Sequence, residues 1–190
     1  MLKKIFLSGA VALTAFVGSQ FNFCGASIPR SQMFLGSLTV GSTVDEMKKI
    51  YGEPTENRHV IEGNNIAIYG KGVKIDYFSF GKGNILGIDI TANNGWKTPA
   101  GIGVGDNISK VLEVYGQPDY SKSNSIKTAY AYYPDGYREN ESSPGLFIVF
   151  NKSNNKILEM YLDNGGGGDR MADPEPVIKR VSYFLNKFVE

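Results

Sequence analysis

Few residues in this 190-residue chain could do acid–base or nucleophilic chemistry. There is one histidine, His59, and one cysteine, Cys24, and no Gly-x-Ser-x-Gly phrase marks a serine nucleophile. A histidine acts as a general base when a second group orients it, and the sequence indicates no such group for His59, which we expect in a loop. The sequence therefore predicts no catalytic residues and a protein that is not an enzyme.

Carboxylates are the remaining candidates for chemistry. Asp76, Asp89 and Asp163 lie in or beside predicted strands, on the side that alternation assigns to solvent. An oxygen-rich run that could suit calcium consists of Asp163, Asn164, Asp169, Asp173 and Glu175. Its spacing matches no established calcium loop, and its four consecutive glycines are typical of a linker. We predict no metal site and no cofactor, and calcium binding by this run stays open.

Tyrosine, tryptophan and arginine are the side chains best suited to protein recognition, and several gather in one region. The predicted partner-binding residues are Tyr130, Tyr132, Tyr133, Tyr137, Arg138 and Trp96. Tyr130 and Tyr132 also fit a second interpretation, as good strand formers that cover a half-buried sheet. Trp96 could either fill a junction between two units or face a partner.

The elements that position these residues are indicated by a repeated phrase. Val-Gly-x-x-Val followed by Tyr-Gly-x-Pro occupies residues 40–54, and the same phrase with Ile in place of the second Val occupies residues 104–118. We interpret this as one supersecondary unit used in tandem.

Each copy of the phrase predicts a short helix. Thr43 and Glu46 form a capping box at the start of the first helix, and Asp106 or Asn107 caps the second. Gly52 and Gly116 end the two helices, because glycine takes the left-handed conformation that follows a last helical turn.

Alternating apolar residues after each helix predict three antiparallel strands per copy. The predicted strands are 66–69, 73–77 and 85–90, then 128–132, 146–150 and 157–162. The fold class is therefore predicted as α+β, with two tandem helix-plus-antiparallel-sheet (αβββ) modules and a C-terminal helix. The predicted segments are a first repeat at 36–92, a linker at 93–100, a second repeat at 101–163, a Gly-rich linker at 164–172 and a helix at 173–190. Whether the modules share one sheet stays open.

The second copy carries an insertion of eight residues in its first hairpin, between Tyr133 and Pro144. Loops at the ends of sheets often carry recognition residues. In the C-terminal helix, an apolar stripe is formed by Val177, Val181, Phe184 and Phe188. We expect this stripe to pack against the sheet or across the repeat junction rather than on a membrane surface.

The N-terminus predicts export. Lys3 and Lys4 precede an apolar run at residues 5–17, which is the pattern of a signal peptide at 1–26. We prefer cleavage after Ala26 to cleavage after Ser19, with no stable membrane span afterwards. A lipid anchor on Cys24 is the less favoured alternative, since the bulky Phe23 precedes it. The expected location is secreted or periplasmic.

Charge argues against nucleic acid as a partner. Removal of residues 1–26 takes away two of the 20 basic residues and leaves 18 against 19 acidic ones. Nucleic-acid-binding domains usually carry a basic patch, whereas lysine, aspartate and glutamate are interspersed here.

An α-β-β-β unit with these phrases resembles two families of exported bacterial proteins. One is the BamE/SmpA-like outer-membrane assembly lipoproteins, and the other is the β-lactamase inhibitory protein family; the resemblance covers residues 36–163. It implies tandem helix-plus-sheet modules that bind other proteins through the sheet face and its loops, without catalysis.

The function predicted from sequence is that of a non-catalytic, exported protein-binding or envelope-assembly factor, with an inhibitor-like role among the possibilities. It would use the sheet face, with the loop from Tyr133 to Pro144 as the specificity element. The partner would be a protein of the cell envelope or the extracellular space, whose identity the sequence does not give. The alternatives are a carbohydrate or cell-wall binding protein and a small carboxylate-dependent hydrolase.

Overall fold

The computed structural model describes residues 28–61, 63–134 and 144–165. Their helices are η1 (Arg30–Gln32), α1 (Val44–Tyr51) and α2 (Ile108–Tyr115). Their strands are β1 (Glu56–Ile61), β2 (Asn64–Ile68), β3 (Val73–Phe78), β4 (Ile85–Ile90), β5 (Tyr120–Ser123), β6 (Lys127–Tyr132), β7 (Gly145–Asn151) and β8 (Ile157–Asp163). The predicted signal peptide and C-terminal helix lie outside the described residues.

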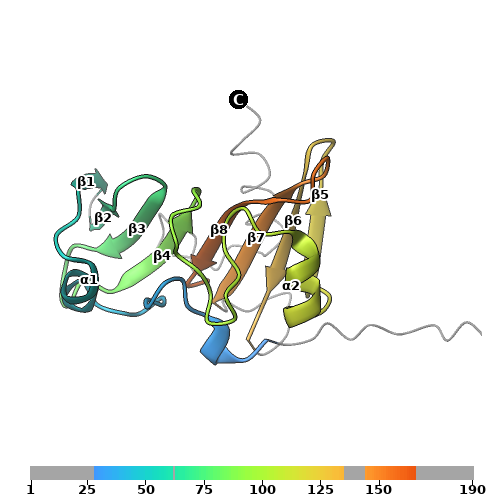
Figure 1. Ribbon diagram of the computed structural model, residues 1–190. Helices are drawn as coiled ribbons and strands as arrows, with labels where there is room; N and C mark the ends of the chain where they lie inside the picture. Colours follow the sequence, from blue (N-terminus) through green and yellow to red (C-terminus); the bar gives the residue numbers. More distant parts are fainter. Residues whose placement is uncertain (1–27, 62, 135–143, 166–190) are drawn as a thin grey trace, which may run out of the picture.

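All eight strands belong to one antiparallel sheet with the order β1-β2-β3-β4-β8-β7-β6-β5 (Figure 1). The predicted fold class, two tandem αβββ modules, is therefore wrong: the described residues form one eight-stranded sheet with two short α-helices. The sheet is continuous because β4 pairs with β8, with Ile88 opposite Leu162. Both strands are rich in apolar residues, and their pairing removes two sheet edges that would expose backbone polar groups.

The two strands that the sequence prediction missed are the outermost ones, β1 and β5. Residues 56–60 of β1 are all exposed, and β5 has only Tyr120 partly buried. An edge strand of this kind has no buried face, so its sequence shows no alternation of apolar and polar residues. Each helix is accordingly followed by four strands rather than three.

The helix ends agree with the sequence prediction. At the start of α1, the Thr43 hydroxyl accepts a hydrogen bond from the Glu46 amide at 3.2 Å, and the Glu46 carboxylate accepts one from the Thr43 amide at 2.8 Å. Asn107, one of the two predicted candidates, caps α2 by accepting from the Ser109 amide at 2.9 Å. Gly52 and Gly116 follow the two helices with φ of +77° and +71°.

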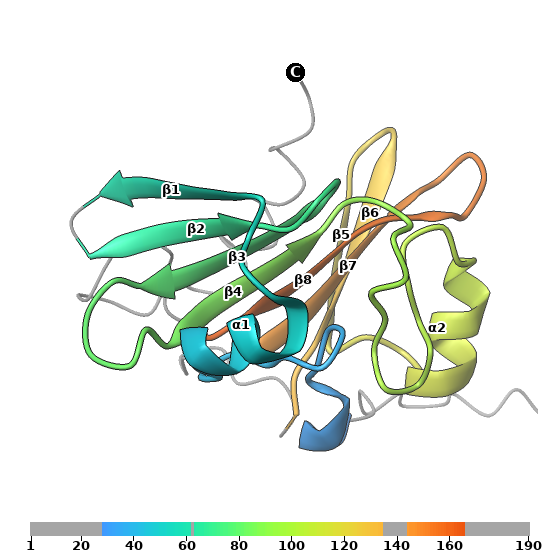
Figure 2. The same ribbon diagram turned by 60° about the vertical axis from the view of Figure 1, so that its left-hand side comes forward.

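The main core lies on one side of the sheet, which we call the first face. Its buried strand residues include Ala67, Ile75, Ile88 and Ile148, and they pack with residues of both helices and of the segment before α1. Figure 2 shows both helices on this same side. The alternate strand residues point to the other side, the second face. Within the described ranges, no helix is long and apolar enough to cross a membrane.

Candidate functional site

Among the described residues, the side chain that His59 contacts is the amide of Asn65. His59 lies on edge strand β1 rather than in the expected loop, and its side chain is exposed. Its Nδ1 atom lies 3.0 Å from Asn65 Oδ1 on the neighbouring strand. Among the residues that the structure describes, no three histidine, cysteine, aspartate or glutamate side chains come together as metal ligands would.

Two of the carboxylates assigned to solvent are in fact buried. Asp89 and Asp163 are 4% and 5% exposed, so the expectation that they are solubilising surface residues is wrong. Asp163 Oδ1 accepts a hydrogen bond from the Gly165 amide at 3.1 Å. The other residues of the calcium hypothesis beyond Asn164, namely Asp169, Asp173 and Glu175, lie outside the described residues.

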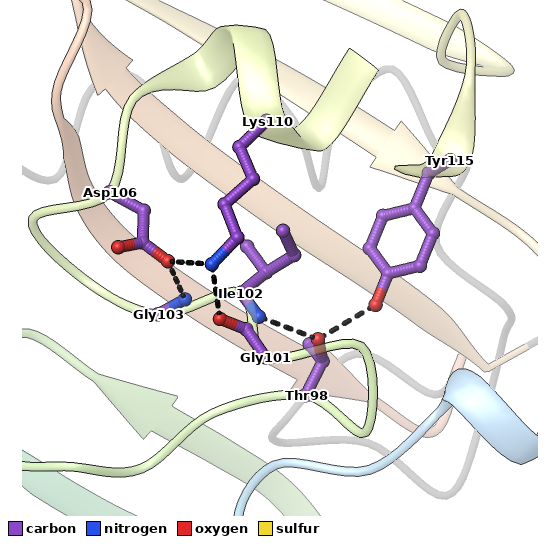
Figure 3. A network of polar contacts seen from close by, with 7 residues as sticks. All are labelled: Thr98, Gly101, Ile102, Gly103, Asp106, Lys110 and Tyr115. Carbon is purple, nitrogen blue, oxygen red and sulfur yellow. Dashed lines mark hydrogen bonds and ion pairs between the residues drawn. The ribbon is translucent and has the colours of Figure 1, made fainter. Parts of the chain in front are cut away.

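A group of polar contacts joins the start of α2 to the segment before it (Figure 3). Lys110 Nζ lies 3.1 Å from Asp106 Oδ2 and donates to the Gly101 carbonyl at 2.7 Å. The Gly103 amide donates to the same Asp106 oxygen at 3.0 Å. Burial by itself would raise the pKa of Asp106, but the hydrogen bonds from Lys110 and Gly103 outweigh it and hold this pKa below its ordinary value.

The same segment is anchored a second time by a buried tyrosine at the end of α2. The Tyr115 hydroxyl donates to Thr98 Oγ1 at 2.7 Å, and Thr98 Oγ1 also accepts from the Ile102 amide at 3.2 Å. Burial raises the pKa of Tyr115, so the phenol stays protonated. An ion-paired carboxylate and a protonated phenol are poor proton acceptors at neutral pH, and we interpret these contacts as structural.

The predicted tyrosines lie in the sheet. Tyr130 is partly buried and Tyr132 fully buried on the first face, where the Tyr132 hydroxyl donates to the Gly116 carbonyl at 3.1 Å. Burial raises the pKa of the Tyr132 hydroxyl above its ordinary value. Tyr133 is 1% exposed and packs edge-on against Phe147, with ring centroids 6.2 Å apart. Tyr132 and Tyr133 would reach a partner only if the surrounding structure opened.

Trp96 is half-buried where the segment after β4 meets α1. Its ring stacks on Tyr51 at 4.3 Å between centroids, and both side chains pack against the main core. Trp96 thus packs against one continuous core rather than at a junction between two modules, and the residue stays partly exposed. Tyr137 and Arg138 lie outside the described residues, as does most of the loop from Tyr133 to Pro144. The partner-binding role of all six residues stays a prediction.

The second face can be followed strand by strand along one transverse row. The paired residues in this row are Glu56, Ile68, Lys74, Asp89, Tyr161, Phe147, Ala131 and Tyr120. The row is exposed or half-exposed from β1 to β3, and it is buried at Asp89 and again at Phe147 and Ala131. The second face therefore has two unlike halves.

Apart from the buried Asp89, the half on β1–β4 is a solvent-facing surface with an apolar centre. Ile66 and Ile68 are half-exposed there. Charged side chains border them on the same face: Glu56, Arg58, Lys74 and Asp76. Arg58 Nη2 donates to Glu56 Oε2 at 2.9 Å, and this hydrogen bond lowers the pKa of Glu56, which favours the ionised pair.

Phe78 and Phe80 extend this apolar area at the β3–β4 turn. Their rings stack at 6.4 Å, and the Phe80 side chain is 59% exposed. With Gly81, Lys82 and Asn84 they line an open pocket of about 330 Å³. We call Ile66, Ile68, Phe78 and Phe80, with the four bordering charges, the β1–β4 surface. The sequence pattern predicts β2, β3 and β4 but neither β1 nor this surface, because the cross-strand register decides which side chains become neighbours.

Comparisons with known proteins do not assign the chain to a family. No protein-family model matches it, and no match is found among curated proteins. Two similar solved structures are an extracellular protein containing an SCP domain from Bacillus anthracis and a cysteine-rich secretory protein from Staphylococcus aureus. The first has a TM-score of 0.42 and 8% identity over 86% of this chain and 50% of that one. The second has a TM-score of 0.47 and 10% identity over 74% of this chain and 49% of that one.

This chain thus spans about half the length of those two proteins. Neither is described as a BamE/SmpA-like lipoprotein or a β-lactamase inhibitory protein, and no family model for either matches. The family resemblance inferred from the sequence is therefore wrong.

Proposed function

We propose that this chain is an exported, non-catalytic protein that binds another protein on the β1–β4 surface. The observation that carries the proposal is the composition of that surface: half-exposed Ile66 and Ile68 lie between charged neighbours on both sides. A protein interface typically has an apolar centre that is desolvated on binding and a polar rim that stays wet. The β1–β4 surface has this arrangement within one rigid sheet.

Two further features support a protein ligand. The exposed Phe80 ring offers a large aromatic contact stacked on Phe78, and aromatic side chains are enriched among interface hot spots. Strand β1 forms the outer edge of the sheet, so an extended segment of a partner could add to the sheet along it. The bordering charges would select a partner with the complementary charge pattern. Two of them are positive, Arg58 and Lys74, and two are negative, Glu56 and Asp76.

Export is supported by the N-terminal sequence, where a basic pair precedes a short apolar run. An exported location would make the partner a protein of the envelope or of the extracellular space. The loop from Tyr133 to Pro144 would then serve as a second, separate contact region.

Site-specific photo-crosslinking in the native host cell tests the proposal. A photo-reactive amino acid replaces Ile68, at the centre of the β1–β4 surface, or Lys49, an exposed residue of α1 on the opposite side of the sheet. We expect one discrete protein adduct from position 68 and none from position 49. Adding Ile66→Glu to the first variant should abolish the adduct, because a carboxylate at the apolar centre would be desolvated on binding.

Two results would contradict this proposal. Equal labelling from positions 68 and 49 would mean random collision rather than a defined surface. If no protein is captured at position 68 while the purified chain binds isolated cell-wall glycan, the carbohydrate-binding alternative would replace it.

A further inference from the structure

The second face of the β5–β8 half is buried although none of the described elements lies over it. Its apolar cluster consists of Ala129, Ala131, Tyr133, Phe147 and Val149, each at most 1% exposed. Among the described residues, the partly buried neighbours that pack against this cluster are Tyr120 and Tyr161, which belong to the same sheet. Both helices lie on the first face (Figure 2). A single-layer sheet leaves one face in water, so a covering segment is required here.

We infer that the chain's own C-terminal segment, residues 173–190, covers the second face of β5–β8 as a second layer. The position where the described chain ends favours this occupant. Strand β8 ends at Asp163, and Asp163 lies on the second face opposite Gly87 and Gly145. The Gly165 amide donates back to this buried carboxylate, so the chain leaves the sheet beside the face to be covered.

The chain between β8 and residue 173 is long enough for residues 173–190 to reach across the β5–β8 half. Residues 166–172 can span roughly 24 Å when extended. The distance from β8 to β5 is three strand spacings, or about 14 Å. An 18-residue helix at 173–190 would be about 27 Å long, which is close to the roughly 23 Å of a seven-residue strand such as β7.

The composition of the segment matches the face in shape and polarity. Val177, Val181, Phe184 and Phe188 recur at helical spacing and form one apolar side. The cluster opposite them combines two alanines with larger aromatic rings, and the alanines leave room for bulky side chains from a second layer.

Charge complementarity points to the same occupant. All three buried acidic residues of the described chain, Asp89, Glu159 and Asp163, lie on the second face. Residues 177–189 contain Lys179, Arg180 and Lys187 and no acidic residue. Arg180 and Lys187 each follow a stripe residue by three positions, which places them along one edge of the apolar stripe. A carboxylate removed from water is stabilised by such a cation.

Thiol protection tests this inference in the chain from residue 27 onward, which contains no native cysteine. Ala131→Cys reports on the second face, and Ala67→Cys, equally buried on the first face, is the matched control. Each reporter is combined with Phe184→Asp, on the stripe, or with Lys179→Asp, on the opposite side of the predicted helix. We expect Phe184→Asp to accelerate alkylation at position 131 at least tenfold and to change position 67 less than twofold.

The Lys179→Asp background should leave both rates within twofold of the parent. If Phe184→Asp accelerated alkylation at both reporter positions, the protein would be unfolding generally. If the alkylation rate at position 131 did not change, another segment or a second copy would cover the face. Either result overturns the inference.

Disulfide formation identifies the occupant directly. Ala131→Cys should crosslink within one chain to cysteines placed at stripe positions and not to one at position 186, whereas crosslinks between two chains would identify a second copy.

Discussion

At the scale of single residues, the ion pair between Asp106 and Lys110 links the stability of the fold to pH. Because the folded pKa of Asp106 lies below its unfolded value, the ionised carboxylate stabilises the fold above about pH 4. This contribution is lost as the pH falls through the folded pKa. We predict that Asp106→Asn lowers the free energy of unfolding by about 1 kcal/mol at pH 7. The difference from the parent should shrink as the pH falls below about 4, the ordinary pKa of an aspartate.

Urea unfolding at several pH values measures this difference. Glu113→Gln, an exposed change of the same kind on α2, controls for the loss of one negative charge. A constant difference between Asp106→Asn and the parent from pH 7 to pH 2 would show that geometry, rather than ionisation, accounts for the loss.

The sequence shows which side chains are present, but it does not show whether each one lies at the surface or in the core. Tyr133 was selected as a contact residue because it precedes a polar loop, yet its ring is 1% exposed against Phe147. Asp89 was assigned to solvent by alternation, yet it is buried. For Asp89 the alternation separates the two faces of the strand correctly, but it does not tell whether a face is exposed to water.

At the scale of elements, the helix ends are defined by a backbone conformation that is nearly exclusive to glycine. Gly52 has φ +77° and ψ −165°, and its amide donates to the Lys48 carbonyl at 2.8 Å. A Cβ atom at Gly52 would meet no atom within 4 Å, so substitution carries only the backbone cost. We predict that Gly52→Ala lowers the free energy of unfolding by about 1–3 kcal/mol, measured by urea denaturation.

Glu53→Ala, at the next and exposed position, is the matched control and should cost less than about 0.5 kcal/mol. Gly116, with φ +71° and ψ −158° at the end of α2, should behave like Gly52. If Gly52→Ala were as stable as Glu53→Ala, the helix would end for a reason other than this conformation.

Element prediction succeeded where local chemistry decides the outcome. The capping box at Thr43 and the stops at Gly52 and Gly116 depend on neighbours within four residues, and the structure confirms them. Strands β1 and β5 depend instead on a partner strand elsewhere in the chain, and their polar side chains carry no burial signal. The β1–β4 surface was missed for the same reason, since it combines residues from several strands through their register.

At the scale of the whole molecule, the pairing of β4 with β8 decides the architecture. The sequence pattern predicts two modules, but no local feature of Ile88 or Leu162 indicates that these residues lie opposite each other. Pairing of this kind is set by long-range packing, which a single sequence does not display. Its consequence is that one core cluster contains buried residues from β3 and β4 as well as from β7 and β8.

A continuous sheet and core predict that the two sides of the β4–β8 pair unfold together. Trp96, the single tryptophan, reports on the α1 side by fluorescence, and amide signals of β6 and β7 report on the other. Ile88→Ala, at a fully buried position of β4, should lower the free energy of unfolding by about 2–5 kcal/mol. We expect both probes to give the same urea midpoint in the parent and to shift equally in the variant.

The control is Ile66→Ala, on the half-exposed second face of β2, which should shift both midpoints much less. The contrary result is a variant in which the urea midpoint reported by Trp96 falls while the midpoint reported by β6 and β7 stays unchanged. The β4–β8 pair would then not couple the two sides, and the molecule would unfold as two units despite its single sheet.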